Sequence, residues 1–474
     1  MVKIGSSIHR IESRVTTPTN VHVISFFLVL IMTYVLLSSM RLHPDQTISI
    51  LVFVSTISGT LLFWNFRLAF ALGGVGILMA SRILHLDLMI DYMSIDVVVF
   101  LVSMMIIVET TEKTGIFRFA ANYLVRVSNH SPRKLLVSLM LLSALLAAMI
   151  DEVTAILIVG TIVIETCQRL KLDVKTFMLS SVFAINIGSA ATVLGNPVGV
   201  LIAFKAGLSF EDFLVWATPV VLVCLGATIL IVLAYFRKQL VMSGASGDIQ
   251  PSLSIDWKRD RKTQLSLCLF LSTLILVGLH VRLESVLDLE KNTLLLAIPF
   301  MAAALALTIH HKEAKEIVEG GVDWWSLLFF MFLFAKTATL EQTGVINLAA
   351  GEMIRIANGN EFILSSILTW PMFFLAGTID NVPLISALIP IVHAIEQNGI
   401  AVYSYWWVIL FVGCFGGNLT LVGSTANIVA LGQMEKKIGH SIGFMEWFKI
   451  GIIVCIATLA IGQLFILLLH PHPI

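Results

Sequence analysis

Long apolar runs separated by short polar segments fill most of this chain. A helix that crosses the hydrocarbon layer needs about 20 mostly apolar residues, and one buried among other helices needs fewer. Candidate spans in the first half are Val21–Met40, Thr47–Trp64, Leu68–Ser81, Val97–Thr110, Leu135–Cys167, Phe177–Phe204 and Phe213–Phe236. In the second half they are Leu265–Leu283, Thr293–His310, Leu327–Leu340, Phe362–Ile395, Tyr405–Leu431 and Ile450–Leu469. The pattern predicts an all-α, polytopic membrane protein.

Two of these runs carry an acid near their middle. Leu135–Cys167 contains Asp151-Glu152-Val153-Thr154, and Phe362–Ile395 contains Asp380-Asn381-Val382-Pro383. A charge inside the hydrocarbon layer costs roughly 2.5–3.5 kcal/mol on insertion scales and usually marks an ion or proton path. The two acid-bearing runs are therefore the first candidates for function.

The placement of Lys and Arg predicts how these two runs sit in the membrane. With a cytoplasmic N-terminus and each acid-bearing run folded as a re-entrant hairpin, most of the 30 Lys and Arg residues lie on the cytoplasmic side. Straight crossings would move the loop that holds Arg169 and Lys175 outside and weaken this bias. We therefore expect about 11 transmembrane helices plus two re-entrant hairpins, with the acids at the hairpin tips.

The second half repeats the order of elements of the first. The offset that links Asp151 to Asp380 also aligns Glu112-Lys113-Thr114-Gly115-Ile116 with Glu341-Gln342-Thr343-Gly344-Val345. With hairpins, the corresponding spans cross in opposite directions, which predicts two repeats of inverted topology around a midplane binding site. The expected parts are N-terminal scaffold helices (1–96), repeat 1 (97–236), a cytoplasmic linker (237–264) and repeat 2 (265–474).

A run rich in glycine and small polar residues follows each hairpin. Pro197 removes a backbone donor and favours a helix break near Gly195, whereas the second break has no proline and rests on its glycines and a run of small polar residues. Broken helices at membrane depth are tolerated where they line a cavity or are buried in protein. The expected hinge residues are Gly188, Gly195, Pro197, Gly416, Gly417 and Gly423.

Each hairpin tip and the broken helix after it would bring together a carboxylate, amides and hydroxyls. This ligand set suits a hard cation such as Na⁺, or a proton on the carboxylate, and Asp151 and Asp380 could exchange one for the other. The candidate ion-binding residues are Asp151, Glu152, Thr154, Asn186, Thr192, Asn196, Asp380, Asn381, Asn418, Thr420, Ser424, Thr425 and Asn427.

Other readings of the charged residues stay open. Asp151 and Asp380 could simply cap the second helix of each hairpin, because Asp accepts hydrogen bonds from free N–H groups there. Glu152, whose counterpart is Asn381, could face the cytoplasm and be solvated. Glu109 and Lys336 lie towards the ends of their spans, and we expect both to snorkel to the membrane surface.

The composition supports a lipid-embedded chain and narrows its function. Of 474 residues, 58% are hydrophobic and 13% are charged, so lipid is the solvent for most of the chain. The net charge of zero gives no support to nucleic-acid binding. The five cysteines form no CxxC pair and are expected to be small buried hydrophobes, so no resident metal or cofactor is predicted beyond a transported Na⁺ or H⁺. No HExxH, GxSxG or GxxxxGK[ST] motif is present, which disfavours an enzyme or an ATP-driven pump.

From Val97 to Phe448 the chain resembles the ion transporter superfamily, and within it the branch of NhaD sodium/proton antiporters, the arsenite permease ArsB and the melanosomal P protein. The most specific matching motifs are Ile379-Asp380-Asn381-Val382-Pro383 with Ile389-Pro390-Ile391-Val392, and the run from Gly416 to Asn427; Asn186–Pro197 and Ala206–Phe213 match less closely. The resemblance implies a scaffold domain, a transport domain of hairpins and broken helices, elevator-type motion and a homodimer.

Departures from the family pattern bear on the substrate. Relatives commonly have Asp-Asn-Val-Thr where this chain has Asp151-Glu152-Val153-Thr154, and Asp-Pro-Pro-Asn where it has Asn196-Pro197-Val198-Gly199. Neither tip has the Ser-Asn-Thr of the related dicarboxylate carriers. Acids at both tips favour Na⁺/H⁺ antiport, followed by arsenite efflux, a di- or tricarboxylate or other anion carrier and, from another class, an ion channel. A multi-pass protein of the bacterial inner (cell) membrane is expected.

Overall fold

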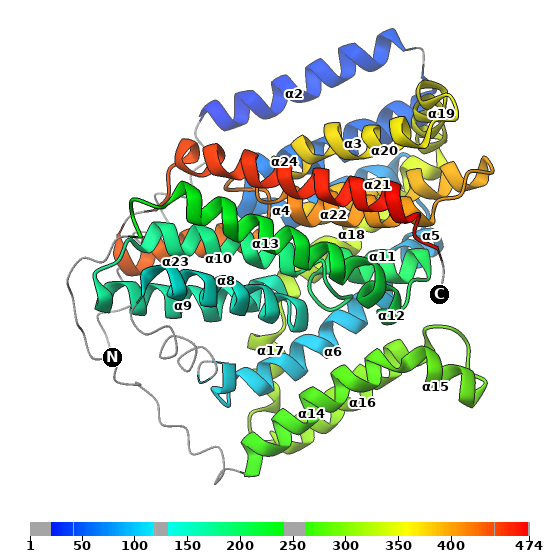
Figure 1. The fold of residues 1–474 in the computed structure, drawn as a ribbon. Coiled ribbons are helices and arrows are strands. Elements are labelled where there is room, and N and C mark those ends of the chain that lie inside the picture. Colours follow the sequence, from blue (N-terminus) through cyan, green and yellow to red (C-terminus); the bar gives the residue numbers. More distant parts are fainter. Residues whose placement is uncertain are drawn as a thin grey trace. The chain divides into compact units, whose positions relative to one another are not determined.

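The computed structural model describes residues 20–40, 42–117, 119, 131–240, 261–439 and 441–472. The polar N-terminal segment before Asn20, most of the basic stretch from Lys113 to Lys134 and most of the linker 237–264 lie outside these residues. The part described is helical and contains no strand (Figure 1).

The helices of the first half are α2 (Asn20–Ser39), α3 (Pro44–Leu62), η1 (Trp64–Phe66), α4 (Arg67–Ala80), α5 (Leu86–Tyr92), α6 (Ile95–Glu112), α8 (Pro132–Met149), α9 (Glu152–Leu170), α10 (Val174–Gly188), α11 (Pro197–Ala206), α12 (Phe210–Asp212), η2 (Phe213–Ala217) and α13 (Thr218–Tyr235). Those of the second half are α14 (Arg261–Gly278), α15 (His280–Leu287), α16 (Thr293–Ile309), α17 (Ala314–Gly321), α18 (Trp324–Gln342), α19 (Val345–Ala357), α20 (Glu361–Ala376), α21 (Asn381–Gln397), α22 (Tyr403–Gly416), α23 (Thr425–Ile438) and α24 (Phe444–Leu469). Every predicted span coincides with one helix or with a pair of helices.

Several helices have the length and hydropathy of membrane spans. Within the described residues six pass this test, and three bent pairs (α5 with α6, α14 with α15, α17 with α18) bring the number to nine. The prediction of an all-α polytopic membrane protein is therefore confirmed. The number of crossings and the re-entrance of the hairpins stay predictions.

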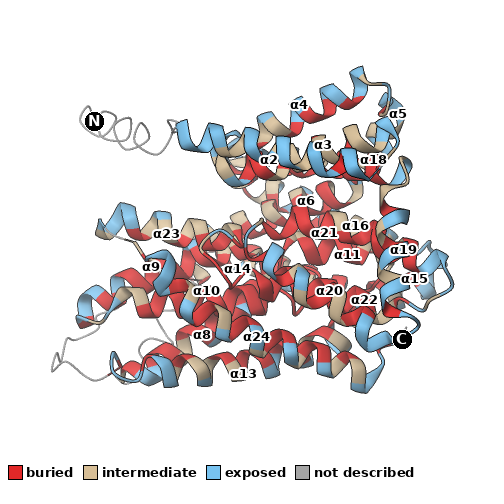
Figure 2. Cartoon of the chain, turned by 90° about the horizontal axis from the view of Figure 1, so that it is seen from above, coloured by how far each residue is buried: buried red, intermediate tan, exposed pale blue. Residues whose placement is uncertain are grey.

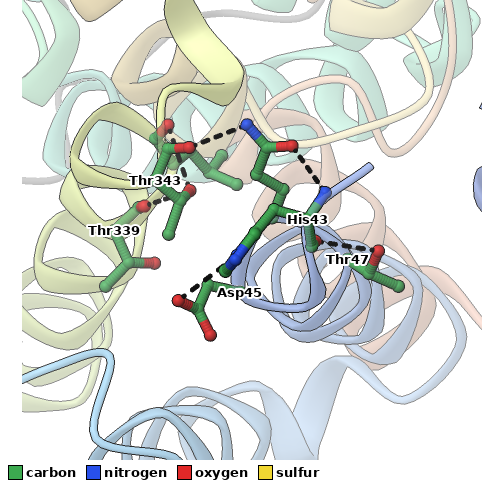
Figure 3. Close-up of polar contacts among 7 residues, drawn as sticks. His43, Asp45, Thr47, Thr339 and Thr343 are labelled. Atoms are coloured by element: carbon green, nitrogen blue, oxygen red, sulfur yellow. Dashed lines mark hydrogen bonds and ion pairs between the residues drawn. The ribbon is translucent and has the colours of Figure 1, made fainter. Parts of the chain in front are cut away.

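The chain divides into two compact units. Unit 1 comprises residues 1–95 and 324–350, and unit 2 comprises residues 96–323 and 351–474. In unit 1, α18 lies against α3, α4 and α5 although it is far from them in sequence. Gln46 in the first turn of α3 donates to the carbonyl oxygen of Thr343 (2.9 Å), just past the end of α18, and so ties these two helices together (Figure 3).

Lys336 of α18 corrects the snorkelling prediction. Its side chain is 1% exposed. Its ammonium donates to Thr56 Oγ1 (2.5 Å) and to the carbonyl oxygen of Phe70 (3.5 Å). Gly74 of α4 leaves the space that the lysine stem occupies, since a Cβ there would lie 3.0 Å from Lys336 Cδ. Lys336 therefore points into unit 1. Glu109, by contrast, is only partly buried.

In unit 2, α10 and α22 form the centre. Both are mainly apolar and are buried over most of their length, from Thr176 to Gly188 in α10 and from Tyr405 to Gly416 in α22, as expected of interior helices (Figure 2). The hairpin α8–α9 packs against α10, and α20, α21 and α24 pack against α22. Glu152 and Asp380 of the two tips are buried, as is the whole of the first helix break, whereas Val422 in the second break is exposed.

The helix starts reproduce the offset between the two halves. The first residues of α6 and α18 are separated by the same offset as Asp151 and Asp380. The same holds for the first residues of α8 and α20, of α9 and α21, and of α10 and α22. The repeated Thr-Gly motif ends α6 and α18 in the same way, with a left-handed glycine at Gly115 (φ 77°) and Gly344 (φ 79°). The repeat in sequence is thus a repeat in structure, while its inverted topology and the predicted domain limits stay predictions.

Candidate ion-binding site

The first hairpin tip uses Asp151 as a helix cap. Its carboxylate accepts from the N–H groups of Val153 and Thr154 (both 2.9 Å) and from Thr154 Oγ1 (2.6 Å). These donors are the free groups of the first turn of α9, so Asp151 is the N-cap that one reading of the sequence predicted. A further role of Asp151 or Thr154 as an ion ligand stays a prediction.

The second tip places its acid differently. Asp380 is 3% exposed, and its side chain does not cap α21. Pro383 stands where the first tip has Thr154, so this tip has neither the hydroxyl nor the N–H of that position. Asp380 Oδ2 instead accepts from Thr425 Oγ1 (3.3 Å), at the start of α23. The Asp380 carboxylate is thus directed to the second broken helix.

Glu152 faces the second tip. The alternative reading of Glu152 as a solvated side chain is wrong, since Glu152 is 3% exposed. Its Oε1 accepts from Ser424 Oγ (3.2 Å), and Asp380 and Asn381 are close enough to act on its charge. Glu152 Oε2 and Asn381 Nδ2 are buried and make no hydrogen bond of ordinary geometry to any described residue.

The start of α23 connects the two acids. Ser424 is the N-cap of α23, accepting from the N–H of Ala426 (3.2 Å), and Thr425 is its first residue. Two adjacent hydroxyls therefore donate to the two carboxylates: Ser424 donates to Glu152 and Thr425 donates to Asp380. Hydroxyl and carboxylate oxygens at a shared buried point are ligands that a hard cation accepts.

Both predicted helix interruptions are confirmed. The chain leaves helical structure between Gly188 and Pro197, and again between Gly416 and Thr425, so Gly195, Gly417 and Gly423 lie inside the interruptions. A Cβ on Gly188 would overlap the backbone of Ala144 in α8, so this glycine permits close contact between the hairpin and the broken helix. Whether these residues act as hinges stays a prediction.

One threonine in each interruption ties it to its hairpin. Thr192 Oγ1 donates to the carbonyl oxygen of Ala148 (2.5 Å) and accepts from the N–H of Leu194 (3.1 Å). Thr420 Oγ1 donates to the carbonyl oxygen of Gly377 and accepts from the N–H of Val422 (3.2 Å). Ala148 and Gly377 are themselves a repeat pair, so the same backbone frame is built twice.

Three asparagines join the two interrupted helices. Asn186 Nδ2 donates to Asn418 Oδ1 (2.8 Å) and to Asn427 Oδ1 (2.9 Å). Asn427 Nδ2 in turn donates to the carbonyl oxygens of Gly417 and Thr420 (both 2.8 Å), which holds the second interruption in shape. These predicted residues are thus brought together in one buried amide network.

Asn196 belongs to a second cluster that the sequence showed only in part. It caps α11 by accepting from the N–H of Gly199 (2.7 Å), and its Nδ2 donates to Ser189 Oγ (2.8 Å) and Cys414 Sγ (3.0 Å). Cys414 is also close enough for Glu152 to act on it. Ser189 and Cys414 were not predicted as site residues; their position beside the Gly188 and Gly416 breaks was the available signal.

Acids dominate the buried charges of unit 2. Among its described residues the buried ionisable side chains, apart from cysteine and tyrosine, are Glu152, Asp212, Glu284, Asp380, His280 and His310. Asp212 accepts from Ser209 and Tyr403, and Glu284 from the N–H groups of Asn292 and Leu294, so both have structural partners. No buried Lys or Arg and no His/Cys/Asp/Glu group able to hold a metal occurs in the described part of this unit.

Comparison with known proteins agrees with this architecture. The uncharacterized transporter Rv2684 of Mycobacterium tuberculosis is 30% identical over 374 residues, which cover 78% of this chain and 85% of the relative. The human P protein is 24% identical over 483 residues, covering 85% of this chain and 57% of that protein. The crystal structure of the Alcanivorax borkumensis YdaH transporter has a similar fold, with a TM-score of 0.54 at 13% identity over 78% of this chain and 85% of that chain.

A protein-family model identifies the family. The model for the citrate transporter family, CitMHS, matches residues 65–412 and, in an overlapping second match, residues 321–471. The resemblance to the ion transporter superfamily is therefore confirmed, and the chain belongs to the CitMHS citrate transporter family within it.

Proposed function

We propose that this transporter exchanges a small monovalent cation, Na⁺ in the first place, for protons through the carboxylates at its two hairpin tips. The observation that carries the proposal is the meeting of buried Glu152 and Asp380 with hydroxyls at the start of α23. A cation offsets the charge of these acids, and a proton does the same, so the two can compete for one site. Competition of this kind couples the two fluxes.

Citrate is the second candidate, because the family description favours it. A citrate anion brings carboxylates of its own to a place where two are already present. Among the described residues of unit 2 no buried Lys or Arg would compensate them. Arsenite, which is neutral at pH 7, meets no such repulsion but gains nothing from the acids, so it ranks third. An ion channel would leave the repeated frame unexplained.

Proton flux in proteoliposomes tests the choice of substrate. Purified protein is reconstituted with a pH-sensitive dye inside the vesicles, and Na⁺, Li⁺, citrate, succinate or arsenite is added outside in turn. We expect Na⁺ or Li⁺ to drive proton movement and the others to have no effect beyond that of protein-free vesicles. A response to citrate alone would keep the family and overturn the cation. Tracer counterflow separates a carrier from a channel.

The wider family properties form part of the same proposal. We infer inverted repeats, a cytoplasmic N-terminus in the cell membrane, elevator-type motion and a homodimer from the sequence pattern and the resemblance. The orientation predicts that Lys171 faces the cytoplasm and Lys291 the outside; both are exposed. Single cysteines at these positions, with exposed Cys268 replaced, should react from opposite sides with a membrane-impermeant maleimide. Reaction from the same side would refute the hairpin topology.

A further inference from the structure

We propose that Glu152 and Asp380 hold one proton between them, that the transported cation takes the place of this proton, and that Asp151 keeps the fixed role of helix cap. The inference rests on the proposed function and assigns its chemistry to particular atoms. The partner of Asp380 is then Glu152, which has no acidic counterpart in the second repeat, and not Asp151, which is the counterpart of Asp380 itself.

The contacts of the two acids support this pairing. Glu152 comes from the first tip and Asp380 from the second, yet both accept from adjacent hydroxyls of α23. Glu152 Oε2 is buried and makes no hydrogen bond of ordinary geometry, although the Asn381 amide is close enough to act on Glu152. A buried acceptor without a well-formed hydrogen bond is costly, and a proton or a cation at this oxygen removes that cost. Glu152 Oε2 is thus the position at which a ligand is expected.

The titratable groups facing Glu152 are Asp151 beside it, Asp380 across the tips and the Cys414 thiol of α22. Asp151 is set apart from these groups by its contacts. It accepts three hydrogen bonds, all from the first turn of its own helix α9, so its carboxylate is held in the cap. The site proper therefore consists of the Glu152–Asp380 pair.

The exchange step balances in atoms and charge. In the proton-loaded state the pair binds one proton and has a net charge of minus one. One Na⁺ enters, both carboxylates become ionised around it, and one proton leaves, so the loaded pair again has a net charge of minus one. The buried region consequently has the same charge on both legs of the cycle, which predicts one-for-one, electroneutral exchange.

Variants of the first tip test the assignment in the same proteoliposomes. Glu152→Gln keeps the size of the side chain and removes its charge, and should raise the half-saturating Na⁺ concentration about tenfold or more. Asp151→Asn keeps a competent cap and should change it less than about threefold. Glu165→Gln, exposed on the same helix, is the control expected to match wild type. A normal Na⁺ dependence in Glu152→Gln, or a larger defect in Asp151→Asn, would overturn the assignment. A transport rate that changes with an imposed membrane potential would also overturn it, because electroneutral exchange does not depend on the potential.

Carbodiimide labelling tests the pair without relying on transport. Dicyclohexylcarbodiimide adds to a protonated carboxyl group in an apolar site and leaves a stable acylurea that mass spectrometry can locate. We expect label on Glu152 or Asp380, strong protection by Na⁺ or Li⁺, and none on Asp151. Label on Asp151, or no protection by either cation, would reject the inference. Wild-type protein that shows protected label but no cation-driven proton flux would retain the shared site and reject the proposed exchange.

Discussion

The two repeats share a backbone frame and differ in the side chains placed on it. In both, a threonine of the broken helix donates to the carbonyl oxygen of the residue three positions before the tip acid, at Ala148 and at Gly377. At the tips the side chains on this frame differ: the first repeat has Glu152 and Thr154, and the second has Asn381 and Pro383. The frame repeats because both halves need the same chain path, whereas the differing side chains give the site its chemistry.

The residues that differ between the repeats contact each other. Asn186 has no amide counterpart in repeat 2, and the asparagines that it contacts, Asn418 and Asn427, have none in repeat 1. Glu152 likewise faces Asn381, its own counterpart. The asymmetric residues of one repeat thus meet those of the other, which is how two similar halves make a single site and not two equal ones.

Removing the acid of the second tip should have the largest effect. Asp380→Asn leaves Glu152 without its partner, and we expect cation-driven proton flux to fall about a hundredfold or more, because the site loses one of the two carboxylates that share the proton and bind the cation. Flux in proteoliposomes measures this, with Glu396→Gln, exposed at the far end of α21, as the control. A monodisperse elution profile must show that the variant is folded. Flux within a few-fold of wild type would separate Asp380 from transport.

Breaking the amide network should be the next largest effect, this time on stability. Asn186→Leu leaves the amide oxygens of Asn418 and Asn427 without their donor, at a cost of about 1–3 kcal/mol for each buried group left unpaired. Thermal unfolding in detergent should show a clear loss of stability, whereas Gln397→Ala, which removes an exposed amide, should leave it unchanged. If Asn186→Leu and Gln397→Ala unfold at the same temperature, the network contributes nothing to the contact between the repeats.

The sequence predicted the elements of this fold better than the partners of its polar residues. Apolar runs, Pro197 and the glycine-rich stretches are local signals, and they located the spans, both hairpins and both interruptions. The burial of Lys336 depends on Thr56 of α3 and on the space left by Gly74 of α4, both far away in sequence. The direction of Glu152 depends on Ser424 in the same way. Position within a span cannot reveal such partners.

The shared threonine frame gives a direct measure of symmetry. Thr192→Val and Thr420→Val each remove one hydroxyl bond to a hairpin carbonyl, and each should destabilise the protein by about 1 kcal/mol. Thr→Ser at either position keeps the hydroxyl and should restore most of the loss in thermal unfolding. Equal losses would support one frame built twice. A large loss of stability in only one of the two variants would show that the threonine bond stabilises only that repeat.

The smallest effect separates the two tip acids by their structural roles. Asp151→Ala removes the N-cap of α9 and should lower the free energy of unfolding by about 1 kcal/mol, whereas Asp151→Asn retains a side chain that caps and should cost little. Asp380 does not cap α21, so Asp380→Ala and Asp380→Asn should differ much less from each other than the two Asp151 variants do. Denaturant titration of the purified variants measures both pairs. An equal gap at the two tips would mean that both acids serve the helix start alike, and the division between a capping acid and an exchanging acid would then have no structural basis.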